Sequence, residues 1–166
     1  MDGILYPKLT ESSNGQSPKY CMIPIVAGTI VDVLNYIVKP IAVPHGPPAL
    51  GFIIHREGHG TFAISGDTGG GLLPFFQDPF KPDPVCVEVT FPNRMDHIAD
   101  KSGHLTPQRL LTELVDALEH NIKVPRILAV HMHPAMEEEI KVELDQAASC
   151  LGVEIVPASE NMRLDI

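Results

Sequence analysis

The chain has 166 residues, which fits a single domain (residues 1–166) with enough length to bury a core. Its 44% hydrophobic and 20% charged residues are typical of a soluble globular protein, and no apolar run approaches the roughly 20 residues that span a bilayer. The formal net charge of −9 argues against extensive binding to a nucleic-acid backbone, although a bound divalent cation would still admit a phosphate-bearing substrate.

The N-terminal residues and the cysteines predict a cytoplasmic protein. Residues 1–16 lack the basic start and apolar core of a signal peptide. Cys21, Cys86 and Cys150 are odd in number and widely spaced, so they form neither a disulfide framework nor a metal knuckle. We expect these thiols to be reduced and buried.

The first half of the chain predicts strands. Residues 1–19 are polar and are expected to form a loop or linker, with a sheet and two helices following over 20–166. The runs "ALGFIIH" and "GTFAIS" are apolar and β-branched and flank "REGHG", which is typical of a hairpin. The expected strands are 20–26, 36–43, 49–55, 60–65 and 85–91, with 29–34 ambiguous and 69–84 a turn-rich connection.

The second half predicts alternating helices and strands. Leucines recur on one face of residues 106–121, with Thr106 as the N-cap and Pro107 at the first helical position. A second helix is expected over 134–152, with acids in its first turn and Gly152 at its end. Short strands at 126–131 and 153–156 follow these helices. This order predicts an α/β protein with helices packed on a sheet.

Three polar residues each follow an apolar strand at its C-terminal end: His45, Asp67 and His131. Functional groups of α/β proteins gather at this end of the strands. Two imidazoles and a carboxylate suit zinc, manganese or iron, and a carboxylate can bridge two ions roughly 3.5–4 Å apart. The glycines after Asp67, Gly69 among them, would let backbone amides approach an anion closely.

Each of these residues also has a structural interpretation. Asp-Thr-Gly after a strand is a common turn pattern, so Asp67 alone is equally consistent with a turn. A single histidine at a strand end is more often a hydrogen-bonded structural residue than a ligand, which applies to both His45 and His131. Composition and spacing therefore indicate a possible metal site and no more.

A second pair of candidates is Glu88, the acid in the strand "VCVEVTF", and His104, which opens the segment before the leucine-rich helix. Burying Glu88 costs several kcal/mol unless the carboxylate is paired, so a partner is expected. A Glu–His pair can orient an imidazole for proton transfer. The alternative is a surface glutamate and a histidine near a helix cap.

The succession "PHG…FAISGDTG…EVTFPN…SGHLTP…LAVHMHP" resembles the C-terminal half of the class II cyclic-nucleotide phosphodiesterases of the metallo-β-lactamase superfamily. The matching segments cover most of the chain. "SGHLTP" leading into the leucine-rich helix is the most family-like piece. The resemblance implies an α/β fold of the metallo-β-lactamase type: the second half of an αββα sandwich, a mixed sheet with helices on one face.

The resemblance also implies roles for the candidate residues. His45 and His131 look like metal ligands, and Asp67 looks like the carboxylate that bridges two divalent ions, two zinc ions or alternatively manganese or iron. Glu88 and His104 are similar to the pair that assists proton transfer to the leaving oxygen. The implied reaction is hydrolysis of cAMP or cGMP to the 5′-monophosphate, with Asp67, Glu88 and His104 catalytic and with Gly69 and His104 contacting the cyclic-nucleotide substrate.

The superfamily motif H-x-H-x-D-H is absent, and the H-x-H in "HMH" is followed by Pro-Ala. The motif normally lies upstream of every segment matched here. We therefore expect a homo-oligomer, or a missing N-terminal half, because an uncovered sheet presents an apolar face.

Two further functions stay open from the sequence. One is another phosphodiesterase of the same fold, such as a tRNA 3′-processing ribonuclease, which the acidic charge disfavours. The other is a half-domain that has lost hydrolysis and serves as a binding or assembly module. No membrane partner is expected.

Overall fold

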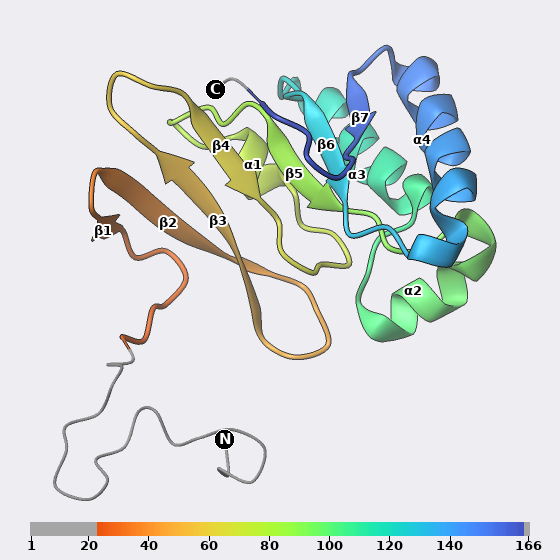
Figure 1. Ribbon diagram of the computed structural model, residues 1–166, viewed down its shortest axis with the longest axis horizontal. Coiled ribbons are helices and arrows are strands. Elements are labelled where there is room, and N and C mark those ends of the chain that lie inside the picture. Colours follow the sequence, from red (N-terminus) through yellow and green to blue (C-terminus); the bar gives the residue numbers. More distant parts are fainter. Residues whose placement is uncertain (1–22, 165–166) are drawn as a thin grey trace, which may run out of the picture.

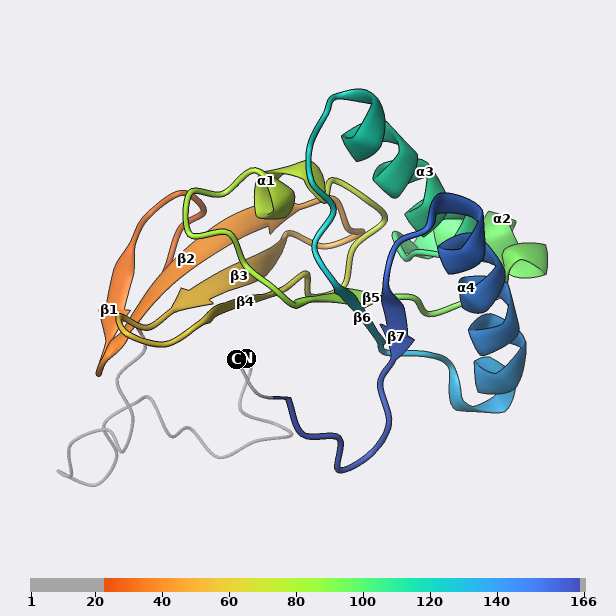
Figure 2. The ribbon, with the colours of Figure 1, turned by 90° about the horizontal axis from the view of Figure 1, so that it is seen from above.

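The structure, a computed structural model, describes residues 23–164. These residues form a seven-stranded mixed sheet in which the spatial order of the strands equals their order in the chain (Figure 1). Seen from above, helices α1 and α3 lie on the same side of the sheet, and α4 packs beside α3 (Figure 2). The expected mixed sheet with helices on one face is therefore present.

The first four strands are antiparallel. The ambiguous segment 29–34 forms only a three-residue strand, and the predicted strand 36–43 and the hairpin are confirmed. No strand forms over residues 23–26; the rest of the strand predicted there, and the linker expected over 1–19, lie outside the described residues. The strands are β1 (Val31–Val33), β2 (Tyr36–Val43), β3 (Ala49–His55) and β4 (Thr61–Ile64).

The last three strands, β5 (Val85–Glu88), β6 (Ile127–Val130) and β7 (Ile155–Pro157), are parallel to one another and to β4. The strand expected over 85–91 ends three residues early. The backbone N–H groups of Thr90 and Phe91 donate to the Leu105 carbonyl instead of to a neighbouring strand. The chain leaves the sheet at this point and turns toward the segment that carries His104.

Both predicted helices are confirmed. Helix α3 (Pro107–Glu119) begins at Thr106, whose side chain accepts a hydrogen bond from the Arg109 N–H. A 3₁₀ turn (Pro134–Met136) precedes helix α4 (Glu137–Leu151), which ends at Gly152 in the left-handed conformation. The helix predicted from 134 onward therefore starts three residues later.

Two short helices escaped prediction. Helix α1 (Leu73–Phe76) lies within the connection expected to be only turns, and α2 (Asp96–Ser102) follows a 3₁₀ turn at Asn93–Met95. The Arg109 guanidinium on α3 pairs with two acids of α2, Asp96 and Asp100. This contact comes from another helix, so the periodicity of the α2 segment does not report it.

The core lies between the sheet and the helices. Ile53 and Ala63 are fully buried, as are the core-facing leucines Leu110 and Leu114 of α3. Because side chains alternate along a strand, the neighbours of Ile53 and Ala63 point to the opposite face. Those neighbours are apolar and only half-buried or exposed: Phe52, Ile54, Phe62 and Ile64. We call them the open face of the sheet.

The thiols do not all behave as the sequence predicted. Cys150 on α4 is exposed, because it lies off the stripe of α4 that faces the core, so the expectation of burial is wrong there. Cys86 on β5 is half-buried, and Cys21 lies outside the described residues. Within residues 23–164 no helix has the length and apolar character to cross a membrane.

Candidate metal centre

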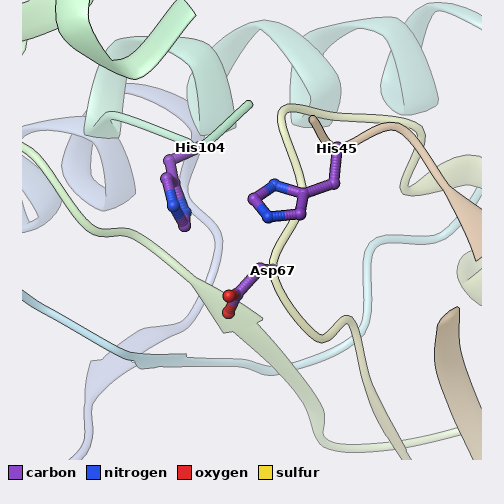
Figure 3. A group of neighbouring side chains, drawn as sticks. All are labelled: His45, Asp67 and His104. Atoms are coloured by element: carbon purple, nitrogen blue, oxygen red, sulfur yellow. The ribbon is translucent and has the colours of Figure 1, made fainter. Parts of the chain in front are cut away.

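Four separate segments bring polar side chains to one edge of the sheet. His45 follows β2, Asp67 follows β4, His104 lies between α2 and α3, and His131 follows β6. Strands β2, β4 and β6 run in the same direction, so their carboxyl ends share this edge. The side chains of His45, Asp67 and His104 extend from three loops into one region (Figure 3).

The distances show how compact this cluster is. His45, Asp67 and His104 each offer a ligand atom, and these three atoms lie within 4.8 Å of one another. The rings of His45 and His104 have centroids 5.0 Å apart, and those of His104 and His131 are 5.7 Å apart. Nδ1 of His131 lies 3.7 Å from Oδ1 of Asp67. The structure thus groups two predicted ligands, His45 and Asp67, with the predicted proton donor His104, and it places the third predicted ligand, His131, beside Asp67 and His104.

Each imidazole is fixed through its Nδ1 atom. Nδ1 of His45 lies 2.9 Å from the carbonyl oxygen of Gly103, and Nδ1 of His104 lies 2.7 Å from Oε1 of Glu88. Nδ1 of His131 lies 2.9 Å from the hydroxyl oxygen of Thr90. A carbonyl and an ionised carboxylate only accept hydrogen bonds, so His45 and His104 carry their proton on Nδ1. Their Nε2 atoms are left as lone-pair donors for a metal or a substrate.

Glu88 is the buried centre of the site, with a side chain 2% exposed. Its Oε1 accepts from the Thr68 N–H and from His104, and its Oε2 accepts from the N–H and hydroxyl of Thr90 and from the Leu105 N–H. Five donors compensate the desolvation of one carboxylate, so the partner expected for Glu88 is present several times over. These bonds tie the Asp67 loop and the His104 segment to the end of β5.

The Asp67 loop is held tightly on both sides. Gly66 before the aspartate has φ +64°, and a Cβ there would approach the Leu50 carbonyl oxygen to 2.8 Å. The Gly69 N–H donates to the Pro44 carbonyl at 2.7 Å. The Gly69 N–H therefore already has an acceptor within the protein. A substrate contact of Gly69 stays a prediction, but a free N–H group does not support it. On the far side of the loop, Glu113 of α3 accepts from the Leu72 N–H.

His131 has a strained backbone. Its φ is +60°, a conformation that costs free energy for a residue with a side chain, of order 1–3 kcal/mol. The segment is held in place from both directions: the Val89 N–H donates to Val130, and the His133 N–H donates to the Thr90 carbonyl. The side chain of His131 is half exposed beside Asp67. Such strain is typical of functional sites, where surrounding contacts maintain it.

The donor set fits a divalent metal ion. It contains imidazole nitrogens with open Nε2 atoms and the Asp67 carboxylate, 48% exposed and without the multiple bonds that occupy Glu88. Nitrogen and oxygen ligands of this kind suit zinc, manganese and iron. Glu88, His104 and His131 also offer three ligand atoms within 4.8 Å of one another. The oxygens of Glu88 already accept five hydrogen bonds, so the group with Asp67 is the better candidate.

Sequence reasoning missed Thr90 and Phe91. Thr90 contacts Glu88, His104 and His131, and the ring of Phe91 packs against His104 at 5.9 Å between centroids. One signal was available: Thr90 lies two residues after Glu88 in an alternating run, which places both side chains on the same side of the chain. The Gly103 carbonyl that orients His45 had no such signal.

Residues 23–164 have the fold of one half of a metallo-β-lactamase domain. The solved metallo-β-lactamase-fold protein YhfI from Bacillus subtilis is similar over 84% of this chain and 52% of its own, with a TM-score of 0.65 and 15% identity. No protein-family model matches the chain, and no curated protein matches it.

Two enzymes are also similar in structure. Human tRNase Z, short form, is 22% identical with a TM-score of 0.56, over 82% of this chain and 45% of its own. An isothiocyanate hydrolase from gut bacteria of Delia radicum is 17% identical with a TM-score of 0.57, over 86% of this chain and 59% of its own. This chain thus spans about half the length of these three solved structures. At these identities the likeness shows the fold.

Proposed function

We propose that this chain carries one half of the active site of a metal-dependent phosphodiester hydrolase, with 3′,5′-cyclic nucleotides as substrates. The observation that carries the proposal is the orientation of the imidazoles. The Nδ1 atoms of His45 and His104 are hydrogen-bonded within the protein, so their Nε2 atoms carry free lone pairs. Both rings lie beside the exposed Asp67 carboxylate. The choice of cyclic nucleotides rests on the sequence resemblance.

The proposed roles follow the sequence resemblance. His45, Asp67 and His131 would hold the divalent ions, and His104, which also lies beside His45 and Asp67, would be left for proton transfer. Bound ions of this kind supply Lewis acidity toward phosphoryl oxygens and lower the pKa of water. Through ions held by these three residues, the phosphoryl group of the substrate would be bound at the rim of the sheet.

His104 is the proposed proton donor, with the Glu88 carboxylate fixing its Nδ1–H at 2.7 Å. In the reaction a water oxygen forms a bond to phosphorus and the bond from phosphorus to the 3′ oxygen breaks. His104, carrying a proton on Nε2, gives that proton to the leaving 3′ oxygen, while the attacking water releases one proton to solvent and His104 takes up a proton again for the next turnover. Glu88 stabilises the imidazolium without leaving its own hydrogen bonds. The product is the nucleoside 5′-monophosphate.

The second candidate is tRNA 3′ processing. Its support is the likeness in fold to human tRNase Z and to a long-form RNase Z from yeast, the latter with a TM-score of 0.52 and 17% identity. The net charge of −9 opposes it, because a long RNA requires a basic surface. Cyclic nucleotides carry a single phosphate and make no such demand.

We also propose that the open face of the sheet is covered in the working protein. Its half-buried apolar side chains on β3 and β4 are what a second sheet of a sandwich would cover. For the isolated chain we expect self-association through this face, measured as mass by light scattering after size-exclusion chromatography. A stable monomer at high concentration would contradict this part of the proposal.

The test combines metal content with activity. The full chain is loaded with Zn²⁺ or Mn²⁺, the bound metal is counted by elemental analysis, and turnover is measured on cAMP, on cGMP, on a generic aryl phosphodiester and on precursor tRNA. Asp67→Ala should abolish stoichiometric metal binding. Asp145→Ala, which removes an exposed carboxylate of α4, should not change it.

Each outcome selects one function. Stoichiometric metal that is lost in Asp67→Ala, together with cyclic-nucleotide turnover, supports the proposal, and turnover of precursor tRNA alone supports the second candidate. Metal binding far below one ion per chain, with the same value for Asp67→Ala, would replace both by a non-catalytic half-domain. Loss of metal from Asp145→Ala would show that the assay reports unspecific binding to surface acids.

A further inference from the structure

Thr90 lies where the hydrogen bonds of the candidate site meet. Its hydroxyl oxygen is 2.9 Å from Oε2 of Glu88, 2.9 Å from Nδ1 of His131 and 3.3 Å from Nδ1 of His104. The residue is 7% exposed, so water competes little for these contacts. One buried hydroxyl therefore connects the central carboxylate with the imidazole that follows β6.

Counting protons fixes the direction of each bond. A hydroxyl has one proton to donate and two lone pairs to accept with, whereas an ionised carboxylate only accepts. The proton of Thr90 therefore goes to Oε2 of Glu88. His104 lies closer to Glu88, at 2.7 Å, so its Nδ1–H is satisfied by Oε1. The lone pairs of Thr90 are left for Nδ1 of His131, which must then carry the proton.

We propose that Thr90 is a positioning residue that holds His131 in the tautomer with the proton on Nδ1 and leaves its Nε2 bare. The chain of bonds runs from His131 through the Thr90 hydroxyl to Glu88. Glu88, which makes no direct hydrogen bond to His131, thus sets the proton position of this imidazole through the Thr90 hydroxyl. Partners of this kind fix ring orientation and raise the basicity of a ligand. The metal-binding consequence rests on the proposed function, whereas the tautomer itself does not.

The first experiment reads the tautomer without any metal. Long-range proton–nitrogen NMR on the metal-free full chain, recorded at about pH 8, where an ordinary imidazole is neutral, shows which ring nitrogen of His131 carries hydrogen. We expect Nδ1–H in the natural protein and in Thr90→Ser, which keeps the hydroxyl. Thr90→Val has nearly the same shape and lacks the hydroxyl, so its His131 should shift toward the Nε2–H form.

The second experiment reads the consequence for a ligand. Zn²⁺ affinity, measured by competition with a chelator, should fall about 10–100-fold in Thr90→Val and return close to the natural value in Thr90→Ser. The matched control is Thr61→Val. Thr61 is also 7% exposed and its hydroxyl lies 2.8 Å from Nδ1 of His55, but this pair joins the far end of the β3–β4 hairpin. Its Zn²⁺ affinity should be unchanged.

The two experiments fail independently. An Nε2–H tautomer of His131 in the natural protein, or an unchanged tautomer in Thr90→Val, would overturn the proposal whatever the metal data show. A changed tautomer with unchanged Zn²⁺ affinity would overturn the positioning role. If the natural protein binds no Zn²⁺, the proposed function fails and the NMR result alone decides the assignment of His131. Should Thr90→Val not fold by circular dichroism, the tautomer of the natural protein and of Thr90→Ser still decides.

Discussion

Two buried carboxylates, Asp78 and Glu88, are compensated in different ways. Asp78, 4% exposed, follows α1, where it pairs with the Lys39 ammonium and accepts from the Phe80 N–H. Glu88, 1% exposed, has no cation of a lysine or arginine beside it among residues 23–164 and instead accepts from backbone, hydroxyl and imidazole donors. Lysine closes an ion pair, whereas histidine has a second nitrogen to offer. In this protein the Glu88–His104 pair therefore leaves a nitrogen lone pair for the candidate site, whereas the ammonium of the Asp78–Lys39 pair has no lone pair to offer.

The largest expected effect comes from neutralising the two acids. In Glu88→Gln the amide NH2 group would face N–H and O–H groups that now donate to the carboxylate. We therefore expect a loss of about 3–5 kcal/mol in the free energy of unfolding. Asp78→Asn should cost less, about 1.5–3 kcal/mol, because Lys39 is 29% exposed and can turn to water. Urea unfolding followed by circular dichroism measures both. A larger loss in Asp78→Asn would reverse the comparison.

Removing one imidazole should weaken metal binding at the candidate site and should leave it unchanged at the other end of the molecule. His45→Ala should weaken Zn²⁺ binding by more than about 100-fold, beyond the effect of losing an outer partner of a ligand. His55→Ala is the control, because His55 stacks on Phe80 and bonds to Thr61 away from the site. Chelator competition gives both affinities. Equal losses in the two variants would remove the metal assignment from His45.

Thiol reactivity distinguishes the open face from the helical surface, because Cys86 on β5 is the register partner of Ile64 on β4 and so lies on the open face. Burial raises the pKa of the Cys86 thiol, which lowers its reactive thiolate fraction at a given pH. In a Cys21→Ser background, a thiol reagent at pH 8 should therefore modify the exposed Cys150 well before Cys86. Covering the open face should slow Cys86 further and leave Cys150 unchanged. Faster reaction of Cys86 would show that this region opens readily.

The smallest effect is expected for an exposed acid–histidine pair, Asp116 and His120, which contrasts with the buried pair of Glu88 and His104. The Asp116 carbonyl, which accepts from His120, and then the negative charge of Asp116 raise the pKa of His120. The pair therefore adds stability below the unfolded pKa of the histidine, and this is lost as pH rises through the higher folded pKa. Asp116→Asn keeps the carbonyl, so NMR titration should show only a partial return of the His120 pKa, with little change in stability.

Much of the fold could be predicted from local pattern. Helices α3 and α4 carry their own caps and apolar stripes, and the β3–β4 hairpin carries its own turn. Helix α2 could not be found this way, because its acids are held by Arg109 from another helix. The early end of β5 likewise depends on the Leu105 carbonyl, which is distant in the chain.

The sequence predicts which residues gather at the site only where they follow strands that end at the same edge of the sheet. His45, Asp67 and His131 come together for that reason, and His104 joins them through Glu88. Which nitrogen each imidazole presents was not predictable, because the Gly103 carbonyl and the Thr90 hydroxyl set it through contacts that no local motif encodes. The Gly69 N–H is not free to bind an anion, because it donates to the Pro44 carbonyl.

The agreement between strand order in space and strand order along the polypeptide has a kinetic consequence. Each new strand finds its pairing partner in the strand that precedes it in the chain, so the sheet can grow by successive addition, with loop-closure entropy that is smallest for the hairpins and larger where helices intervene. The edge that gathers His45, Asp67, His104 and His131 would then be assembled progressively as the ribosome proceeds, and it would be complete only after β6 has docked.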